Sequence, residues 1–240
     1  MTPENPISVG TFHKTGTILL GDIFERAASR LGLVFVKAER GFWQKETLRA
    51  FDVLFDGGSR LLKRPDVFGA KARALVSIRD PRDLIVSAAL YHMDSKERWV
   101  VGPSERLGGR SYQESLRALP DDAARFIFEM DHAGGRTIAQ MLKIDRSDPR
   151  LLVTGLDRLM TDRDLVEFRM IFTFLGFRGE ALESCLGIAS ECSVFSGKVE
   201  SGHVRHTEPG FWREHFTPAL AAAFEERFPG AAERLGYAPT

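Results

Sequence analysis

The segment from Val9 to Leu20 places a lysine and a glycine in a short turn of small residues. Residues 7–11 are expected to form a β-strand, and residues 19–31 carry apolar side chains at helical spacing. A turn between a strand and a helix gathers backbone N–H groups and the positive end of the helix dipole, which together bind phosphate or another tetrahedral anion. Lys14 adds a point charge to this turn. The sequence therefore predicts an anion site near the N-terminus.

This turn is a relative of the phosphate loop and not a Walker A sequence. Walker A ends in Gly-Lys-Ser/Thr, whereas here Lys14 precedes Gly16 by two residues. An ordinary strand-to-helix turn with a surface lysine remains the alternative for this segment taken alone.

A second group of charged residues, 79–83, directly follows the apolar run 74–78, which is typical of a strand buried on both faces of a parallel sheet. Pro81 and Asp83 suit the first turn of a helix, because proline lacks the N–H that is unused there and an acidic side chain complements the dipole. The alternative is a solvated helix start with local ion pairs.

The elements that must position these residues alternate along the chain. Further strands are expected at 33–36, 51–55 and 151–154, and helices at 121–133, 135–143, 164–175, 180–190 and 218–227. This alternation predicts a single α/β domain over 1–240, with three layers around a mostly parallel sheet. Residues 96–122 are rich in Gly, Pro, Ser and charge, so we expect a mobile excursion with a binding or lid role.

Composition excludes several classes. The formal net charge is +0, which argues against a dedicated nucleic-acid binder. The 2 cysteines, Cys185 and Cys192, form no disulfide framework or metal-ligand pattern, which indicates a reducing compartment. We see no apolar run of transmembrane length and no signal peptide, so a cytoplasmic protein without a membrane span is expected.

Three separated stretches together resemble the sulfotransferase family that uses 3′-phosphoadenosine 5′-phosphosulfate (PAPS). Residues 11–19, Thr-Phe-His-Lys-Thr-Gly-Thr-Ile-Leu, are similar to that family's Tyr-Pro-Lys-Ser-Gly-Thr-Thr-Trp loop around the 5′-phosphosulfate. Residues 78–87 are similar to its 3′-phosphate site, in which a serine follows an arginine by eight residues, as Ser87 follows Arg79. The first two motifs are specific as a pair, although each alone is weak.

The third stretch, residues 205–213, is like the family's late Arg-Lys-Gly-x-x-Gly-Asp-Trp-Lys segment, but Thr207 replaces a glycine and Phe211 an aspartate. Between the second and third stretches, residues 156–160 and 174–177 resemble the Tyr-Glu-Asp-Leu and Phe-Leu-Gly landmarks, without the tyrosine. The resemblance thus covers nearly the whole chain. The aromatic residues near 211–216 are also explained as core side chains.

The resemblance implies two anion sites on one nucleotide. The backbone N–H groups of Thr15, Gly16, Thr17 and Ile18 would hold the 5′ end, and Lys14 would stabilise charge on the leaving phosphate oxygen during sulfuryl transfer. Arg79, Ser87 and Arg205 would bind the 3′-phosphate. The resemblance implies no metal. The expected partner is a small-molecule or glycan acceptor with a hydroxyl or amine; its identity, and the oligomeric state, are not readable from the residues.

The acceptor base is where the sequence departs from the family. Many cytosolic members have a histidine in a Lys-Thr-His-Leu-Pro segment, and residues 61–65 resemble its surroundings but lack the histidine. Other branches use a glutamate after the second strand, which makes Glu39 the first candidate and His92 the second. The alternative for Glu39 is a surface ion pair with a neighbouring basic residue.

Two rival functions remain. A phosphate-loop kinase or NTPase would bind ATP in the same turn, but the sequence lacks Gly-Lys-Ser/Thr and a convincing magnesium carboxylate at a strand end. A catalytically silent nucleotide-binding module would bind 3′-phosphoadenosine 5′-phosphate (PAP), the desulfated product, without turnover.

Overall fold

The computed structural model describes residues 1–38, 42, 50–63, 71–196 and 208–239. The chain divides into two compact units, which are described separately. The first unit comprises Met1–Arg79 and Ile144–Glu208, and the second comprises Asp80–Lys143 and Pro209–Thr240. The organisation of residues 1–240 as one domain stays a prediction.

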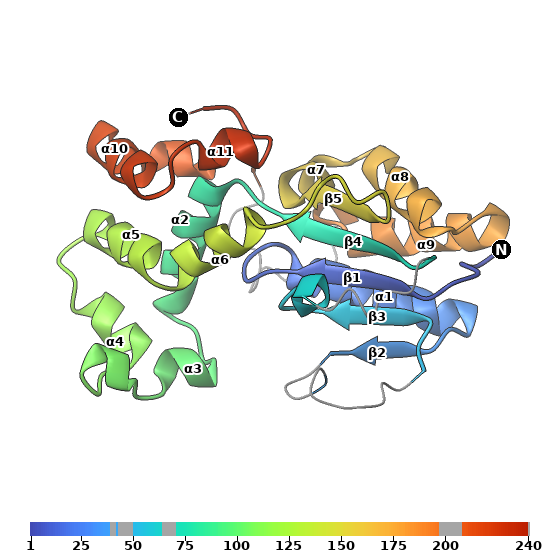
Figure 1. The fold of residues 1–240 in the computed structure, drawn as a ribbon, viewed down its shortest axis with the longest axis horizontal. Helices are drawn as coiled ribbons and strands as arrows, with labels where there is room; N and C mark the ends of the chain where they lie inside the picture. The colour runs from blue at the N-terminus through green and yellow to red at the C-terminus, as the bar shows by residue number, and fades with distance from the viewer. Residues whose placement is uncertain (39–41, 43–49, 64–70, 197–207, 240) are drawn as a thin grey trace. The chain divides into compact units, whose positions relative to one another are not determined.

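The first unit is built on a parallel β-sheet (Figure 1). Its strands are β1 (Ile7–Thr11), β2 (Phe35–Lys37), β3 (Val53–Asp56), β4 (Arg73–Ile78) and β5 (Leu151–Gly155). They lie in the order β2-β3-β1-β4-β5, and each neighbouring pair in this sheet is parallel. The α/β class and the parallel sheet expected from the sequence are confirmed. β1 lies centrally, with β3 on one side and β4 on the other.

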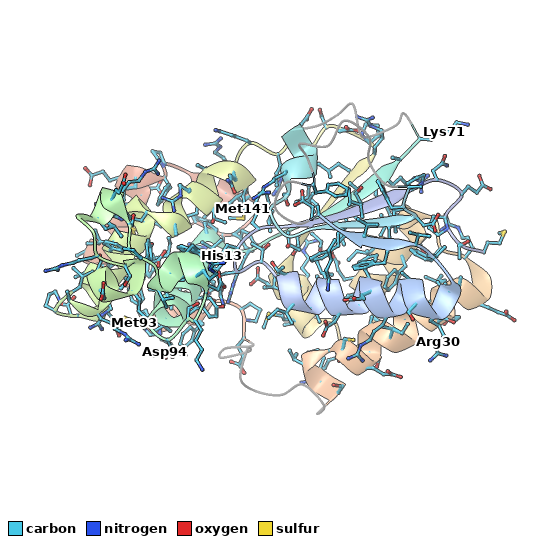
Figure 2. The ribbon with its side chains drawn as sticks, turned by 90° about the horizontal axis from the view of Figure 1, so that it is seen from below. His13, Arg30, Lys71, Met93, Asp94 and Met141 are labelled. Carbon is cyan, nitrogen blue, oxygen red and sulfur yellow. The ribbon has the colours of Figure 1, made fainter. Side chains whose placement is uncertain are left out.

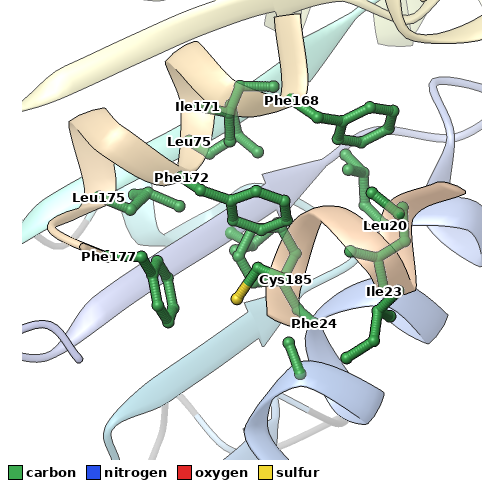
Figure 3. Packing of buried hydrophobic residues seen from close by; sticks show 14 of the residues in the cluster. Leu20, Ile23, Phe24, Leu75, Phe168, Ile171, Phe172, Leu175, Phe177 and Cys185 are labelled. Atoms are coloured by element: carbon green, nitrogen blue, oxygen red, sulfur yellow. The ribbon is translucent and has the colours of Figure 1, made fainter. Parts of the chain in front are cut away.

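Helices of the first unit supply its apolar core. They are α1 (Thr17–Leu31), α7 (Leu156–Thr161), α8 (Val166–Leu175) and α9 (Gly179–Cys192), with short 3₁₀ turns η2 (Arg60–Lys63) and η4 (Val194–Ser196). Leu20 and Phe24 of α1, Leu75 of β4, Phe172 of α8 and Cys185 of α9 are all buried in one cluster (Figure 3). Burial raises the pKa of the Cys185 thiol to about 12, so this cysteine behaves as a small apolar side chain.

The second unit is helical in its described residues. It contains α2 (Pro81–His92), α3 (Arg98–Val101), α4 (Tyr112–Arg117), α5 (Asp122–Asp131), α6 (Ala133–Met141), α10 (Pro218–Arg227) and α11 (Ala231–Arg234), with 3₁₀ turns η3 (Glu105–Leu107) and η5 (Phe211–Glu214). In this part of the chain no helix is both long and apolar enough to cross a bilayer, and the same holds for the described residues of the first unit.

Short helices are where the sequence-based assignment was incomplete. Residues 96–122, expected to form a mobile excursion, contain α3, η3 and α4. Ser111 and Glu114 form a reciprocal capping box at the start of α4, and Val100, Tyr112 and Leu116 are buried. Elements of one or two turns show too few periods of apolar spacing to be detected, which also explains why α7 was missed. The mobility of this segment stays a prediction.

Candidate functional site

The turn after β1 has a strained and internally bonded backbone. Lys14 has a φ of 65° and Gly16 a φ of 94°, so both lie in the left-handed region. The Thr15 hydroxyl accepts a hydrogen bond from the Phe12 N–H (2.8 Å) and donates one to the Phe12 carbonyl (3.1 Å). The Thr15 N–H also donates to the Phe12 carbonyl, at 3.2 Å. A lysine held at positive φ is uncommon, and such strain gathers at functional sites.

Side chains from the neighbouring strands hold the carbonyl groups of this turn. The Ser77 hydroxyl, on β4, donates to the Thr15 carbonyl at 2.7 Å. Arg79, just beyond β4, donates through Nη1 to the Lys14 carbonyl at 3.4 Å. Because a trans peptide points its N–H away from its C=O, the Gly16 N–H faces away from Ser77. Ser77 and Arg79 thus hold the carbonyl oxygens of Thr15 and Lys14 on the outer side of the turn. The Gly16 N–H is left on the inner side.

The first turn of α1 continues this set of donors. Its first intrahelical hydrogen bond joins the Leu20 N–H to the Gly16 carbonyl at 3.0 Å. The N–H groups of Thr17, Ile18 and Leu19 therefore have no acceptor within the helix. Gly16 provides no side-chain cap and the first turn contains no acidic residue. Free amides and an uncompensated dipole favour an anion at this point.

Figure 2 shows which edge of the sheet carries the turn. His13 lies beyond the start of α1, whereas Arg30 lies at the end of that helix. Lys71, which precedes β4, lies on the same side as Arg30. The turn and its half-buried Lys14 therefore occupy the carboxyl edge of the parallel sheet, where ligands of open α/β sheets bind.

Arg79 carries the most informative unsatisfied group in the first unit. It is 7% exposed, and its Nε has no hydrogen-bond partner among the described residues. A buried guanidinium N–H without an acceptor is unfavourable, and the strongest acceptors for it are phosphate and carboxylate oxygens. The burial of Arg79 contradicts the alternative of a solvated helix start. Its Nε–H is a donor suited to the phosphate that the sequence predicts beside Arg79.

The rest of that motif belongs to the second unit. The Asp80 carboxylate caps α2 by accepting from the Arg82 N–H (2.9 Å), and it also binds the Arg82 guanidinium at 2.8 Å. This guanidinium lies 4.0 Å from the centre of the Trp212 ring. The local ion pair in the alternative interpretation is therefore present, but it is buried. Ser87 lies on α2 and is partly exposed.

Asp83 connects α2 to the third motif. Its carboxylate accepts hydrogen bonds from the N–H groups of Gly210 (2.8 Å) and Trp212 (2.7 Å), and it is 1% exposed. Trp212 is buried, which confirms that it is a core aromatic. Sequence reasoning assigned Asp83 only to the helix dipole, because its partners lie more than a hundred residues away in the chain.

His92 is held by contacts with buried side chains of the second unit. It is fully buried in the second unit, and its Nδ1 is hydrogen-bonded to Oε1 of Glu129. Its ring also makes edge contacts with Trp99 and Tyr112. A general base must reach the hydroxyl or amine of the acceptor, and the contacts described here enclose His92 without an opening to one. Its role as acceptor base stays a prediction, as do the roles of Glu39 and Arg205, which lie outside the described residues.

Asp56 was missed by the sequence analysis. It is the last residue of β3, is 1% exposed, and accepts a hydrogen bond from the Gly58 N–H at 3.1 Å. Asp56 is therefore a carboxylate at the end of a strand, and the expectation that the chain lacks a magnesium carboxylate at such a position stays a prediction. An Asp before two glycines indicates a turn from sequence, but strand order is needed to place it beside β1. Among the described residues no group of three possible metal ligands is found.

Comparisons with known proteins identify the fold. No protein-family model and no curated protein matches the sequence. Among solved structures, mouse sulfotransferase SULT7A1 complexed with PAP matches with a TM-score of 0.62 and 15% identity, over 96% of this chain and 85% of that one. Retinol dehydratase with androsterone and the inactive cofactor PAP matches with a TM-score of 0.52 and 14% identity, over 96% and 81%. Its complex with retinol and PAP gives 0.53 and 13%, over 96% and 82%. The chain therefore has the α/β fold of these sulfotransferase and retinol dehydratase structures, all of which contain PAP.

Proposed function

We propose that the chain is a PAPS-dependent sulfotransferase, which moves a sulfuryl group onto the hydroxyl or amine of an acceptor and releases PAP. The observation that carries this proposal is the buried Arg79. It donates to the Lys14 carbonyl of the loop and keeps an unsatisfied Nε beside it. A nucleotide with phosphate groups at both its 3′ and 5′ positions satisfies both the loop amides and this arginine.

Within the first unit the residues divide into two groups. The N–H groups of Gly16, Thr17 and Ile18 would hold the 5′ end, because they lack intrahelical acceptors. The Thr15 N–H already donates to Phe12, so Thr15 contributes mainly by shaping the loop. Arg79 would bind the 3′-phosphate. Ser87 and Arg205 complete that set in the proposal, on the strength of the sequence resemblance.

Lys14 would act on the transition state. Sulfuryl transfer breaks the bond between sulfur and the bridging oxygen of the 5′-phosphate, so negative charge grows on that oxygen. A cation already positioned there lowers the barrier, typically by about 3–4 kcal/mol for a preorganised donor. The fixed backbone of the loop, with Lys14 at a φ of 65°, provides this preorganisation.

A phosphotransferase that uses ATP and Mg²⁺ is the second candidate, and Asp56 is the observation that favours it. A carboxylate at the end of a strand beside a phosphate loop suits a magnesium site. The loop sequence opposes it, because the Gly-Lys-Ser/Thr ending is absent. Arg79 opposes it as well, since ATP has no 3′-phosphate to accept from that guanidinium.

The acceptor is proposed as a small molecule, because two of the matching structures contain androsterone or retinol. A glycan acceptor remains an alternative. The cytoplasmic location and the absence of a metal requirement stay predictions.

Turnover tests the proposal. The protein is incubated with PAPS labelled in its sulfuryl group and a panel of alcohols, phenols, amines and sugars, and PAP release and labelled product are measured. Lys14→Ala should lower turnover about 100-fold or more with an unchanged melting temperature. Lys37→Ala is the matched control, because Lys37 is exposed and pairs with Glu25 at 2.6 Å.

Lys37→Ala should turn over as the wild type does. Near-normal turnover in Lys14→Ala would remove Lys14 from the mechanism. Tight PAP binding with no turnover of any acceptor would instead support the catalytically silent module.

A further inference from the structure

Ser77 lies on β4 beside the loop that follows β1. The strand register places it opposite Thr11, the last residue of β1. A Cβ placed on Gly16 would lie 3.9 Å from the Ser77 Oγ. Ser77 is fully buried, and so is Thr15 of the loop. A buried hydroxyl is expected to have a hydrogen-bond partner, and Ser77 has one in this loop.

The partner of Ser77 is a carbonyl group of the loop. The Ser77 hydroxyl donates to the Thr15 carbonyl at 2.7 Å. This carbonyl and the Gly16 N–H belong to one trans peptide, whose two polar groups point in opposite directions. A hydrogen bond that fixes the carbonyl therefore also fixes the direction of the N–H that is proposed to hold the 5′ end of the nucleotide.

Gly16 does not by itself determine the orientation of this peptide. Its φ is 94°, and reversing the peptide between residues 15 and 16 would bring that angle into the negative range, which glycine adopts about as readily. The reversed peptide would present the Thr15 oxygen, instead of the Gly16 N–H, to the inner side of the turn. A carbonyl oxygen carries partial negative charge and would oppose an anion there. The hydrogen bond to Ser77 therefore decides which polar group a nucleotide meets.

The other hydrogen bonds of the loop hold different groups. The Thr15 hydroxyl is bonded to the backbone N–H and the carbonyl of Phe12. Arg79 donates through Nη1 to the Lys14 carbonyl at 3.4 Å. These bonds fix the residues before the peptide, whereas Ser77 fixes the peptide itself.

We propose that Ser77 is a positioning residue for the 5′ end of the nucleotide, an inference that rests on the sulfotransferase function proposed above. It acts through the peptide between Thr15 and Gly16 and does not touch the nucleotide itself. Its hydroxyl keeps the carbonyl on the outer side of the turn, so the Gly16 N–H is ready to donate to the 5′-phosphosulfate. The 3′ end, which Arg79 is proposed to bind, does not depend on Ser77.

Two substitutions remove the hydrogen bond with little change of volume. Ser77→Ala has no donor and Ser77→Cys has only a weak one, so the buried Thr15 carbonyl loses its partner in both. Each variant is titrated calorimetrically with PAP, adenosine 5′-phosphate and adenosine 3′-phosphate. The affinities for PAP and adenosine 5′-phosphate should each fall about 10-fold, and the affinity for adenosine 3′-phosphate should stay unchanged.

Thr154→Val is the matched control. Thr154 lies on β5 directly opposite Ser77, is 2% exposed, and donates through its hydroxyl to Oε1 of Glu167 at 2.7 Å. Its loss should lower the melting temperature as Ser77→Ala does and leave all three affinities unchanged. A loss of affinity in Ser77→Ala that is equal for the two mononucleotides, or that Thr154→Val reproduces, would show a purely structural role and overturn the proposal.

The Gly16 amide gives a second readout, which a change of stability alone would not move. In protein labelled with ¹⁵N, its resonance should shift strongly when the wild type is saturated with adenosine 5′-phosphate. The shift should be much smaller in saturated Ser77→Ala, because the N–H no longer faces the phosphate. An equal shift in both proteins would mean that the peptide keeps its orientation without Ser77.

Failure of this inference and failure of the proposed function give different results. Turnover of PAPS by the wild type, with an unchanged affinity of Ser77→Ala for adenosine 5′-phosphate, would overturn only the role of Ser77. A selective loss of adenosine 5′-phosphate binding in Ser77→Ala, without any turnover of PAPS by the wild type, would overturn the function and support the positioning role. Absence of binding of all three nucleotides to the wild type would overturn both.

Discussion

Arg79 is the residue on which, in this proposal, recognition of the nucleotide 3′-phosphate depends. Its Nε is buried and has no hydrogen-bond partner among the described residues, so a 3′-phosphate would supply the missing acceptor. Arg79→Ala should weaken PAP binding by about 1.5–3 kcal/mol, the usual value of a hydrogen bond to a charged group. Binding of adenosine 5′-phosphosulfate, which lacks the 3′-phosphate, should barely change. Calorimetric titration of both nucleotides measures the difference.

Arg30→Ala serves as the control for that experiment. Arg30 lies in the last turn of α1, at the opposite end from the loop (Figure 2). It should leave both affinities unchanged. Equal losses of the two nucleotides in Arg79→Ala would show that this arginine does not recognise the 3′ end.

Single residues divide into those that the sequence could identify and those that it could not. Lys14 and Gly16 were predicted as site residues because loop chemistry is encoded in consecutive residues, and the structure places both at positive φ. Asp56 was missed because its proximity to β1 depends on strand order, which no local pattern specifies. The alternative of a solvated Arg79 is wrong because this side chain is buried. The sequence could not exclude that alternative, because burial depends on residues distant in the chain.

At the scale of elements, the strand–loop–helix unit depends on Gly16. At a φ of 94°, an alanine would be strained by about 1–2 kcal/mol, and its Cβ would lie 2.8 Å from Cδ1 of Leu156. Gly16→Ala should therefore lower the free energy of unfolding by more than this strain and should also weaken PAP binding. Chemical denaturation and calorimetry measure the two effects.

Gly32→Ala is the matched control, because Gly32 caps the other end of α1 at a φ of 67° with nothing within 4 Å of its Cβ position. It should show the strain alone, with PAP affinity unchanged. If Gly16→Ala is no more destabilised than Gly32→Ala and binds PAP normally, the loop geometry described above is not required.

Elements with a continuous or periodic apolar pattern were predictable, and helices of one or two turns were not. The strand at residues 7–11 and the helix at 218–227 match β1 and α10 at both ends, since their apolar runs and the proline at the start of α10 mark the boundaries. The strand expected at 33–36 lies at 35–37, because its first residues connect to α1. The helices within 96–122 are stabilised by a capping box and tertiary burial more than by periodicity.

At the scale of the molecule, the fold is secured by comparison and the function is proposed from the site. The matching structures are 13–15% identical in sequence to this chain, and at this level of identity the comparison shows the fold alone. A neutral chain gives no general attraction for anions, and a nucleotide must therefore be bound by the local donors of the loop and Arg79.

Binding of PAP compared with ATP tests the central claim most directly. The wild-type chain is titrated calorimetrically with PAP, with adenosine 5′-phosphosulfate, and with ATP plus Mg²⁺. We predict that PAP binds most tightly and raises the melting temperature, because it alone presents a phosphate to both the Gly16 loop and Arg79. Tighter binding of ATP with Mg²⁺, or no binding of PAP, would contradict the account.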